Sequence, residues 1–292
     1  MSDAERQKIT IPRLAAMKAR GERIAMITCY DATFARLLAR TDVEMLLIGD
    51  SLGMVVQGHD TTIPVTLDDV LYHTKAVTRT RPLAHVVADM PFMSYQASAE
   101  QAMLSAGRLV KEGGAESVKL EGGMELVDTV ARMTAAGIPV MAHIGLKPQR
   151  VHQMGGYKIQ GKNPDTADQL LREAEAFVAA GAYGLLLEGV AIETAAQITQ
   201  RVPVPTIGIS SGPDCDGQVL VLHDLLGLNP DFAPKFVKRY ADLGATVTTA
   251  VQTYCTEVKT SAFPTAAHGF HREANQSLLP IGEKVRMRGR KP

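Results

Sequence analysis

The stretch LLIGDSLG (residues 46–53) carries a short apolar run directly into an aspartate and a serine. A run this short and this rich in aliphatic residues suits a strand that is buried on both faces of a parallel sheet. Eight such runs occur in the chain. They are residues 24–28, 45–48, 85–88, 116–120, 138–142, 183–187, 204–209 and 218–222. The sequence therefore predicts eight buried strands.

Segments with helical periodicity separate these strands. The clearest is NPDTADQLLREAEAFVAAG, residues 163–181, where Asn163 suits the N-cap, Pro164 the first helical position and Gly181 the C-terminal stop. About eight alternations of strand and helix predict an α/β fold, and they favour closure into a (β/α)8 TIM-like barrel over an open, doubly wound sheet. We expect a single barrel domain over residues 1–292, with short extensions at about 1–20 and about 263–292.

Composition and charge narrow the class of protein. Hydrophobic residues make up 46% and charged residues 21%, a balance typical of globular proteins. Lys plus Arg and Asp plus Glu both number 31, which argues against a nucleic-acid partner. Cys29, Cys215 and Cys255 are widely spaced and match no metal-binding pattern, which favours a reducing compartment. No apolar run approaches the roughly 18 residues of a membrane span, so we expect a cytoplasmic protein with no membrane partner.

Ionisable residues recur where the predicted strands end. They are Asp50, Asp89, Glu121, His143 and Glu188. Each alone has an ordinary explanation as a cap, a turn residue or a satisfied interior histidine. In a barrel, however, these ends converge on one mouth, where acids repel one another unless a cation or shared protons offset their charge.

The residue types at this mouth suggest a chemistry. Carboxylates without a cysteine or multiple-histidine set match a hard ion, most simply one Mg²⁺, whose open positions accept the carboxylate and keto oxygens of a 2-oxo acid. Glu188 follows three leucines, which favour its neutral form and make it the predicted base. Asp50, Asp89 and Glu121 remain for the metal. Ser51, Lys119 and His143 can donate to the substrate, and alternation along the strand places Lys119 on the same face as Glu121.

Several motifs together carry a resemblance to a known family. They are IGDSLGM (48–54), GHDTTIPVT (58–66), VADMPFMSY (87–95), VKLEGG (118–123), HIGLKPQ (143–149), GGYK (155–158) and DGQVLVLHD (216–224). Over roughly residues 10–240 the chain closely resembles the ketopantoate hydroxymethyltransferase family, also called 3-methyl-2-oxobutanoate hydroxymethyltransferase. The resemblance implies a barrel of the phosphoenolpyruvate/pyruvate type and a homo-oligomer, commonly a decamer.

The same resemblance implies a reaction and roles for matching residues. A one-carbon unit passes from 5,10-methylenetetrahydrofolate, the cosubstrate, to 3-methyl-2-oxobutanoate through a Mg-bound enolate, which gives 2-dehydropantoate and tetrahydrofolate in pantothenate biosynthesis. Asp50, Asp89 and Glu121 correspond to Mg²⁺ ligands, and Glu188 to the proton acceptor. Substrate contacts fall on Asp50, Ser51, Asp89, Lys119 and His143.

The chain departs from the family pattern in three places. GISSG (208–212) stands where GIGAG is usual, and LEGVA (187–191) lacks the proline often found shortly after the base. These two departures fall in loops expected to receive the folate and leave the folate contacts open. Separately, Lys147 stands where a smaller residue is common.

Two other functions remain open from the residues alone. The first is a Mg²⁺-dependent lyase or aldolase on the same barrel that acts on a 2-oxo acid or a phosphonate; only the transferase should consume methylenetetrahydrofolate. The second is a non-catalytic metabolite-binding or scaffold protein, against which the complete set of acids argues.

Overall fold

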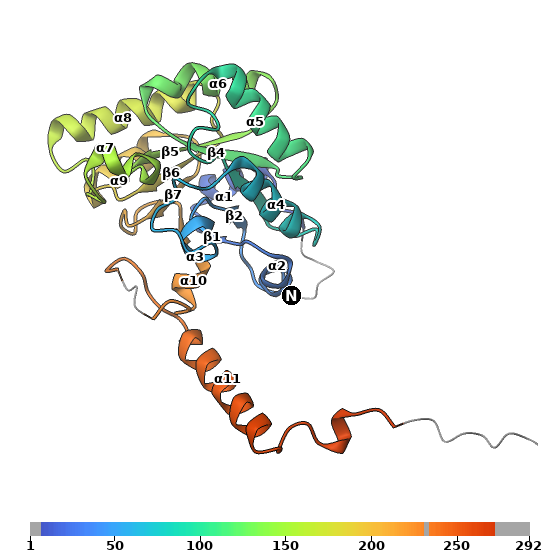
Figure 1. Ribbon diagram of the computed structural model, residues 1–292. Coiled ribbons are helices and arrows are strands. Elements are labelled where there is room, and N and C mark those ends of the chain that lie inside the picture. The colour runs from blue at the N-terminus through green and yellow to red at the C-terminus, as the bar shows by residue number, and fades with distance from the viewer. Residues whose placement is uncertain (1–6, 231–233, 272–292) are drawn as a thin grey trace, which may run out of the picture. The chain divides into compact units, whose positions relative to one another are not determined.

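The computed structural model describes residues 7–230 and 234–271. By its internal contacts the chain divides into two compact units, residues 1–241 and 242–292. The first unit is a closed barrel of eight parallel strands in chain order (Figure 1). The predicted (β/α)8 barrel is therefore confirmed, and each of the eight predicted runs contributes one strand.

The strands are short, as expected for a barrel wall. They are β1 Ile24–Thr28, β2 Met45–Ile48, β3 His85–Asp89, β4 Ser117–Glu121, β5 Val140–Gly145, β6 Gly184–Glu188, β7 Thr206–Ile209 and β8 Gly217–Leu220. The largest departure from the prediction is β5, which starts two residues late and runs on through His143 to Gly145. Pro139 precedes this start, and a proline has no N–H to give to the ladder.

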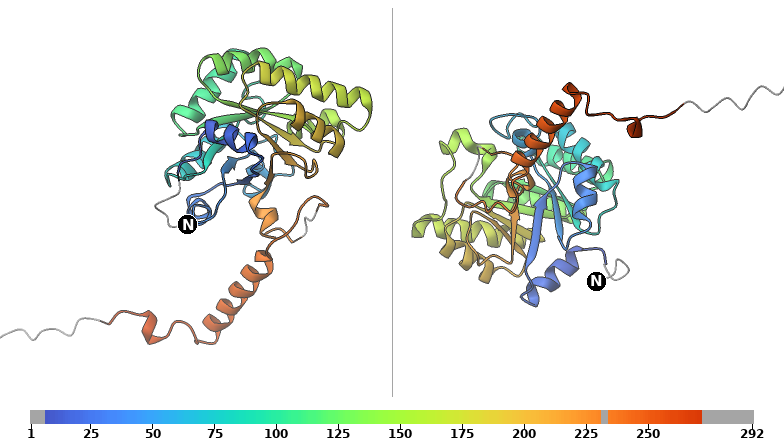
Figure 2. Two further views of the ribbon diagram at one scale, coloured as in Figure 1. Left: turned by 180° about the vertical axis from the view of Figure 1, so that it is seen from behind. Right: turned by 90° about the horizontal axis from the view of Figure 1, so that it is seen from below.

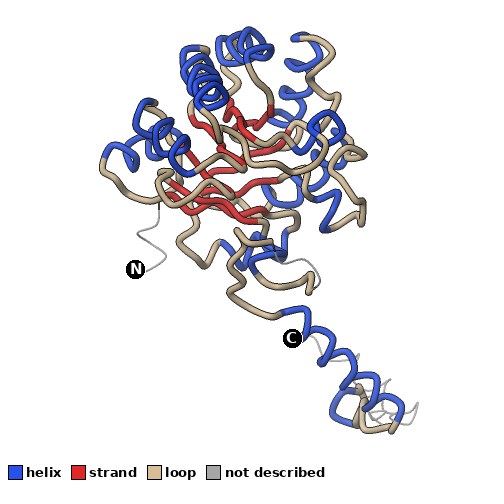
Figure 3. Tube along the Cα trace, turned by 90° about the vertical axis from the view of Figure 1, so that its left-hand side faces the viewer, coloured by secondary structure: helices blue, strands red, loops and turns tan. Residues whose placement is uncertain are grey.

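Helices form an outer layer around the strands of the first unit, as Figure 3 shows in blue and red. They are α1 Ile11–Ala19, α2 Ala32–Leu38, α3 Leu52–Val55, α4 Leu67–Thr78, α5 Ala99–Lys111, η2 Met124–Leu126, α6 Val127–Ala135, η3 Pro148–Arg150, α7 Val151–Met154, α8 Pro164–Ala179, α9 Ile192–Arg201 and α10 Leu222–Leu225. The predicted start of α8 is confirmed, because Asn163 Oδ1 accepts a hydrogen bond of 2.9 Å from the N–H of Thr166.

Two apolar clusters leave one end of the barrel for polar groups. Val118 and Leu120 point outward into the cluster shared with the helices. Met45 belongs to the inner cluster, which also contains Leu14 and Met17 of α1. This N-terminal helix, dark blue in Figure 2, thus packs against the interior from the end where the strands begin. The carboxyl ends of the strands are left for the polar site.

The second unit contains α11 Leu243–Lys259 and a short turn, η4 Ala266–His268. Asp242 is the N-cap of α11. The rings of Tyr254 and Phe263 pack edge to face, with 5.7 Å between their centroids. The extension predicted from about residue 263 falls within this unit, with residues 272–292 outside the described part of the chain. The single-domain interpretation stays a prediction. Among the helices of the described residues, none combines the length and apolarity that a membrane span needs.

Candidate active site

The barrel brings the predicted ionisable residues to one rim. Asp89 at the end of β3 lies opposite Lys119 on β4, and Glu121 at the end of β4 lies opposite His143 on β5. Glu188 ends β6, the next strand around the barrel. Because neighbouring parallel strands are in register here, side chains that are 30 residues apart (Asp89 and Lys119) or 22 residues apart (Glu121 and His143) become direct neighbours.

Asp50 joins this group from the turn after β2. Its N–H donates to Asp89 Oδ2 at 2.9 Å, and Lys119 Nζ lies 2.8 Å from Asp89 Oδ1. Asp50, Asp89 and Lys119 are all buried, with Asp89 only 2% exposed. Gly49 permits the close packing of this turn, because a Cβ on Gly49 would lie 2.7 Å from Ser51 Oγ and 3.4 Å from Asp89 Oδ2. The small residue in the GDS sequence therefore serves close packing at the rim.

Ser51 and His143 complete the predicted set. Ser51 Oγ lies 2.8 Å from the hydroxyl of Tyr30, so the serine is held beside Asp50. His143 is buried, and its Nδ1 lies 3.3 Å from Lys119 Nζ while its Nε2 lies 3.4 Å from Glu188 Oε2. Burial and the charges of Lys119 and Lys147 hold the pKa of His143 well below its usual value. A neutral ring that accepts from Lys119 at Nδ1 carries its proton on Nε2, toward Glu188.

Burial and mutual repulsion make the acids at this rim reluctant to ionise. Burial raises the pKa of Asp50 to about 6, and the charge of Asp89 adds to this effect. The pKa of Asp89 is also raised by burial, and burial and Asp50 together raise the pKa of Glu121 well above its usual value. Burial raises the pKa of Glu188 to about 7. Such shifts are typical of acids gathered in a catalytic site.

Lys119 provides only part of the positive charge that these acids need. Burial alone would lower the pKa of Lys119, but Asp89, Asp50 and Glu121 outweigh it and raise the pKa above the usual value of lysine. Lys119 is therefore a cation, and it faces three acids with one charge. Burial is the main cause of the raised pKa values of these carboxylates, and repulsion that Lys119 does not offset adds to it at Asp50, Glu121 and Glu188.

The chemistry of the carboxylate set fits a hard divalent cation. Asp50, Asp89 and Glu121 present oxygen donors, which Mg²⁺ prefers, and once ionised they would carry more negative charge than Lys119 neutralises. As the side chains stand, no group of three or more His, Cys, Asp or Glu residues within the described ranges is arranged to hold an ion. Binding would therefore require small rotations of these carboxylates.

Gln149 is a buried member of the rim that the sequence reasoning did not select. Its N–H donates to Glu121 Oε1 at 2.8 Å, and its Nε2 donates to Asp50 Oδ2 at 2.9 Å. Its Oε1 accepts a hydrogen bond of 2.7 Å from the hydroxyl of Tyr95. The sequence feature that could have identified Gln149 is its position in HIGLKPQ, shortly after a strand that ends in the site.

The GISSG departure is accommodated at the ends of β6 and β7. Ser210 has a φ of 54°, a left-handed conformation that favours the glycine common in the family. Ser211 is 1% exposed; its hydroxyl donates to the carbonyl of Leu187 at 2.8 Å and accepts from the N–H of Val190 at 3.0 Å. These two bonds bracket Glu188, so the serine in place of alanine ties down the backbone around the predicted base.

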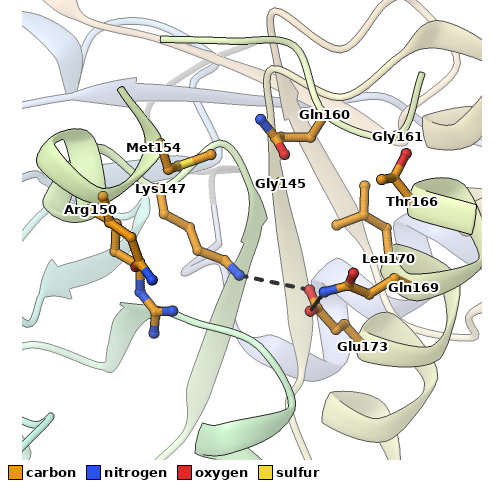
Figure 4. Close-up of a pocket in the computed structure, with 11 residues that line it drawn as sticks. Gly145, Lys147, Arg150, Met154, Gln160, Gly161, Thr166, Gln169, Leu170 and Glu173 are labelled. Carbon is orange, nitrogen blue, oxygen red and sulfur yellow. Dashed lines mark hydrogen bonds and ion pairs between the residues drawn. The ribbon is translucent and has the colours of Figure 1, made fainter. Parts of the chain in front are cut away.

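A cavity of about 150 Å³ adjoins the rim between the end of β5 and α8. Figure 4 shows Lys147 reaching from one wall toward Glu173 on the other, and their charged atoms are 3.8 Å apart. Gln169 donates to Glu173 at 3.0 Å, and Arg150 forms an ion pair with Glu125 beside the cavity. Lys147, the third departure from the family pattern, therefore anchors the loop after β5 to α8.

Comparisons with known proteins agree with this architecture. Residues 8–266 match the family model described as ketopantoate hydroxymethyltransferase. A 3-methyl-2-oxobutanoate hydroxymethyltransferase from Anaeromyxobacter sp. (strain K) is 55% identical, with 95% of this chain and 92% of the relative covered. One from Geobacter sulfurreducens is 54% identical, with 89% and 98% covered.

Solved structures of lower identity support the fold. A phosphoenolpyruvate phosphomutase from Streptomyces platensis subsp. rosaceus has a TM-score of 0.58 at 18% identity, covering 86% of this chain and 88% of its own. A 2,3-dimethylmalate lyase, described as a member of the PEP mutase/isocitrate lyase superfamily, has a TM-score of 0.56 at 16% identity, with 95% and 97% covered. These likenesses support the (β/α)8 barrel fold. From the family model and the identities of the relatives, the chain belongs to the ketopantoate hydroxymethyltransferase family.

Proposed function

We propose that this hydroxymethyltransferase transfers a one-carbon unit from 5,10-methylenetetrahydrofolate to 3-methyl-2-oxobutanoate. With one water consumed, the products are 2-dehydropantoate and tetrahydrofolate, in pantothenate biosynthesis. Membership of the family supports this substrate, since relatives that are more than half identical over most of the chain carry its name. The observation that best supports the proposal is the arrangement of the site: the barrel mouth brings together Asp50, Asp89, Glu121 and Lys119, with Glu188 beside them.

Glu188 is proposed to remove the proton from C3 of the oxo acid. A carboxylate whose pKa lies at about 7 is half ionised near neutral pH and is a stronger base than an ordinary glutamate. Loss of that proton leaves an enolate, whose C3 forms the new bond to the one-carbon unit. Over the whole reaction both C–N bonds of the methylene bridge break, the two folate nitrogens are left as N–H in tetrahydrofolate, and water supplies the new hydroxyl oxygen. His143 Nε2 lies 3.4 Å from Glu188 Oε2 and makes no hydrogen bond as the side chains stand, so a rotation of the carboxylate would let the ring donate its proton to it.

Asp50, Asp89 and Glu121 are proposed to hold one Mg²⁺ per subunit. When bound, that ion would supply a Lewis acid that polarises the keto group and stabilises negative charge on its oxygen by several kcal/mol. Lys119, a fixed cation beside Asp89, is placed to neutralise the carboxylate of the substrate. Asp50, Ser51, Asp89 and His143 are the other proposed contacts to the oxo acid.

The assembly and setting of the enzyme are also proposals. We infer a homo-oligomer, with a decamer favoured by the family, that acts in the cytoplasm on small molecules and binds neither nucleic acid nor a membrane. The equal numbers of acidic and basic residues support the last two points. Sedimentation velocity measures the assembly, and a sharp boundary at the mass of one 31.4 kDa chain would contradict it.

Two assays test the proposed reaction and separate it from its rivals. In the first, solvent deuterium should enter C3 of 3-methyl-2-oxobutanoate when Mg²⁺ is present and no folate is added, and a chelator should stop the exchange. In the second, 2-dehydropantoate should form only when methylenetetrahydrofolate is supplied. Cleavage of a 2-oxo acid or phosphonate without folate would favour a lyase, and failure of both assays with folded protein would refute the proposal.

A further inference from the structure

Gln149 reaches the centre of the site because the chain turns sharply after β5. Gly145 has a φ of 98°, and a Cβ there would lie 2.4 Å from the carbonyl oxygen of Glu188. The turn η3 follows at once, with Pro148 at its first position. Only glycine fits at position 145, because a side chain there would be strained and would collide with the backbone. Gly145, together with Pro148, whose ring fixes φ, therefore sets where Gln149 lies.

The hydrogen bonds of Gln149 fix the orientation of its side-chain amide. Nε2 donates to Asp50 Oδ2 at 2.9 Å and to the carbonyl of Met90 at 3.0 Å. Oε1 accepts from the hydroxyl of Tyr95 at 2.7 Å and from Nε2 of Gln96 at 3.0 Å. Turning the amide over would place its oxygen against two acceptors and its N–H groups against a donor, so one orientation is strongly favoured.

Gln149 connects two acids that are not neighbours in the barrel. Asp50 follows β2 and Glu121 ends β4, so β3 separates their strands. The side chain of Gln149 binds one oxygen of Asp50, and its main chain binds one oxygen of Glu121. Asp89 Oδ2 is held in the same way, by the N–H of Asp50. One oxygen of Asp50 and one of Glu121 are thereby fixed, whereas Asp89 is held at both oxygens, by the N–H of Asp50 and by Lys119.

We propose that Gln149 is a positioning residue that holds one oxygen of Asp50 and one of Glu121 in place, so that the two acids can turn their other oxygens toward a shared divalent cation. The inference rests on the proposed function, because it takes these acids to be the metal ligands. Partners that hydrogen-bond to metal ligands fix their orientation, and removing one usually weakens metal binding by about 10- to 100-fold. Gln149 touches the carboxylates and not the reacting atoms, so its effect passes through the metal.

The loop that carries Gln149 is held independently of its side chain. Lys147 pairs with Glu173 of α8, and the N–H of Leu146 donates to the carbonyl of Glu188 at 2.7 Å. The bond from the N–H of Gln149 to Glu121 also survives any substitution of the side chain. A substitution of the side chain therefore removes its hydrogen bond to Asp50, together with those to Met90, Tyr95 and Gln96, while the loop and the bond to Glu121 stay in place.

The main test compares Mn²⁺ binding by the unsubstituted full-length protein and Gln149→Met, measured by titration calorimetry without substrates. Methionine keeps the length of the side chain and removes its donors. The affinity should fall by about 10- to 100-fold. Gln153→Met is the matched control, because Gln153 is an exposed residue of the same segment, and its Mn²⁺ affinity should equal that of the parent. If Gln149→Met does not fold, Gln149→Asn keeps an amide but draws it back by one methylene, and the same loss is expected.

A second readout separates positioning from general structural support. The Mg²⁺ concentration that half-saturates deuterium exchange should rise by about 10- to 100-fold in Gln149→Met, while the rate at saturating Mg²⁺ should stay within a few-fold of the parent. A structural role alone would lower the saturated rate and leave the Mg²⁺ requirement unchanged.

The outcomes distinguish this inference from the proposed function. If the parent binds Mn²⁺ and the folded variant binds it equally well, the positioning role is wrong and the metal site stands. If the parent itself binds no Mn²⁺, the proposed metal site is wrong and the inference falls with it.

Discussion

Replacing the proposed base should change both stability and catalysis, and the stability change can be estimated from the structure. The side chain of Glu188 is 23% exposed, and burial raises its pKa from 4.5 to about 7, with Lys119 opposing and Asp50 reinforcing the shift. That difference corresponds to about 3 kcal/mol of destabilisation when the carboxylate is ionised, and partial exposure reduces this to roughly 2–3 kcal/mol.

The sign of the pH dependence follows from linkage. Because the folded pKa of Glu188 exceeds the unfolded one, the native state binds more protons between about pH 4.5 and 7. The contribution of this residue to stability therefore falls as pH rises through that window. Glu188→Gln removes the charge. In metal-free buffer, the variant should be more stable than the parent by roughly 2–3 kcal/mol at pH 8, and by about 1 kcal/mol or less at pH 5.

Urea unfolding in the presence of a chelator at pH 5 and pH 8 measures this difference at a fixed protein concentration. Glu175→Gln is the control, because the side chain of Glu175 is 54% exposed in its ion pair on α8 and its loss should change stability by less than about 0.5 kcal/mol at either pH. In parallel, Glu188→Gln should slow deuterium exchange at C3 by about 10²- to 10⁴-fold. A variant with equal stability differences at both pH values would refute the electrostatic reasoning, and undiminished exchange would refute the role as base.

Three further changes have defined outcomes. Lys119→Met leaves buried acids without their cation and should cost about 3–5 kcal/mol at pH 8 in metal-free buffer, and less at pH 5; urea unfolding that shows no such pH dependence would contradict this. Gly145→Ala forces a Cβ to within 2.4 Å of a carbonyl oxygen at a φ of 98°, so it should lower the unfolding free energy by more than about 1 kcal/mol, seen as a lower thermal midpoint; an unchanged midpoint would count against the close approach. Burial raises the pKa of the Cys29 and Cys215 thiols to about 12 and about 11, so a thiol reagent should modify Cys255 first in the native protein, and rapid modification of all three would show that the two core sites open readily.

Much of the first unit follows from local patterns in the sequence. The eight strands were found from short apolar runs, and the start of α8 from Asn163 and Pro164, because each of these signals depends on a few neighbouring residues. The convergence of acids at strand ends followed from the barrel, since parallel strands direct their carboxyl ends to one rim. The inward face of Lys119 followed from the alternation of side chains along a strand.

What the sequence by itself determined is therefore the order of the elements, the barrel and the rim on which the acids meet, because each depends on periodicity or on strand direction. Only the tertiary structure decided how the acids are held and how strongly they repel one another. Gln149 and Asp50 are separated by 99 positions in the chain, and their hydrogen bond exists because the fold brings the turn after β5 against the turn after β2. The three leucines before Glu188 predicted the direction of its pKa shift, but the size of the shift depends on burial in the closed barrel and on the charges of Lys119 and Asp50, which are remote in sequence.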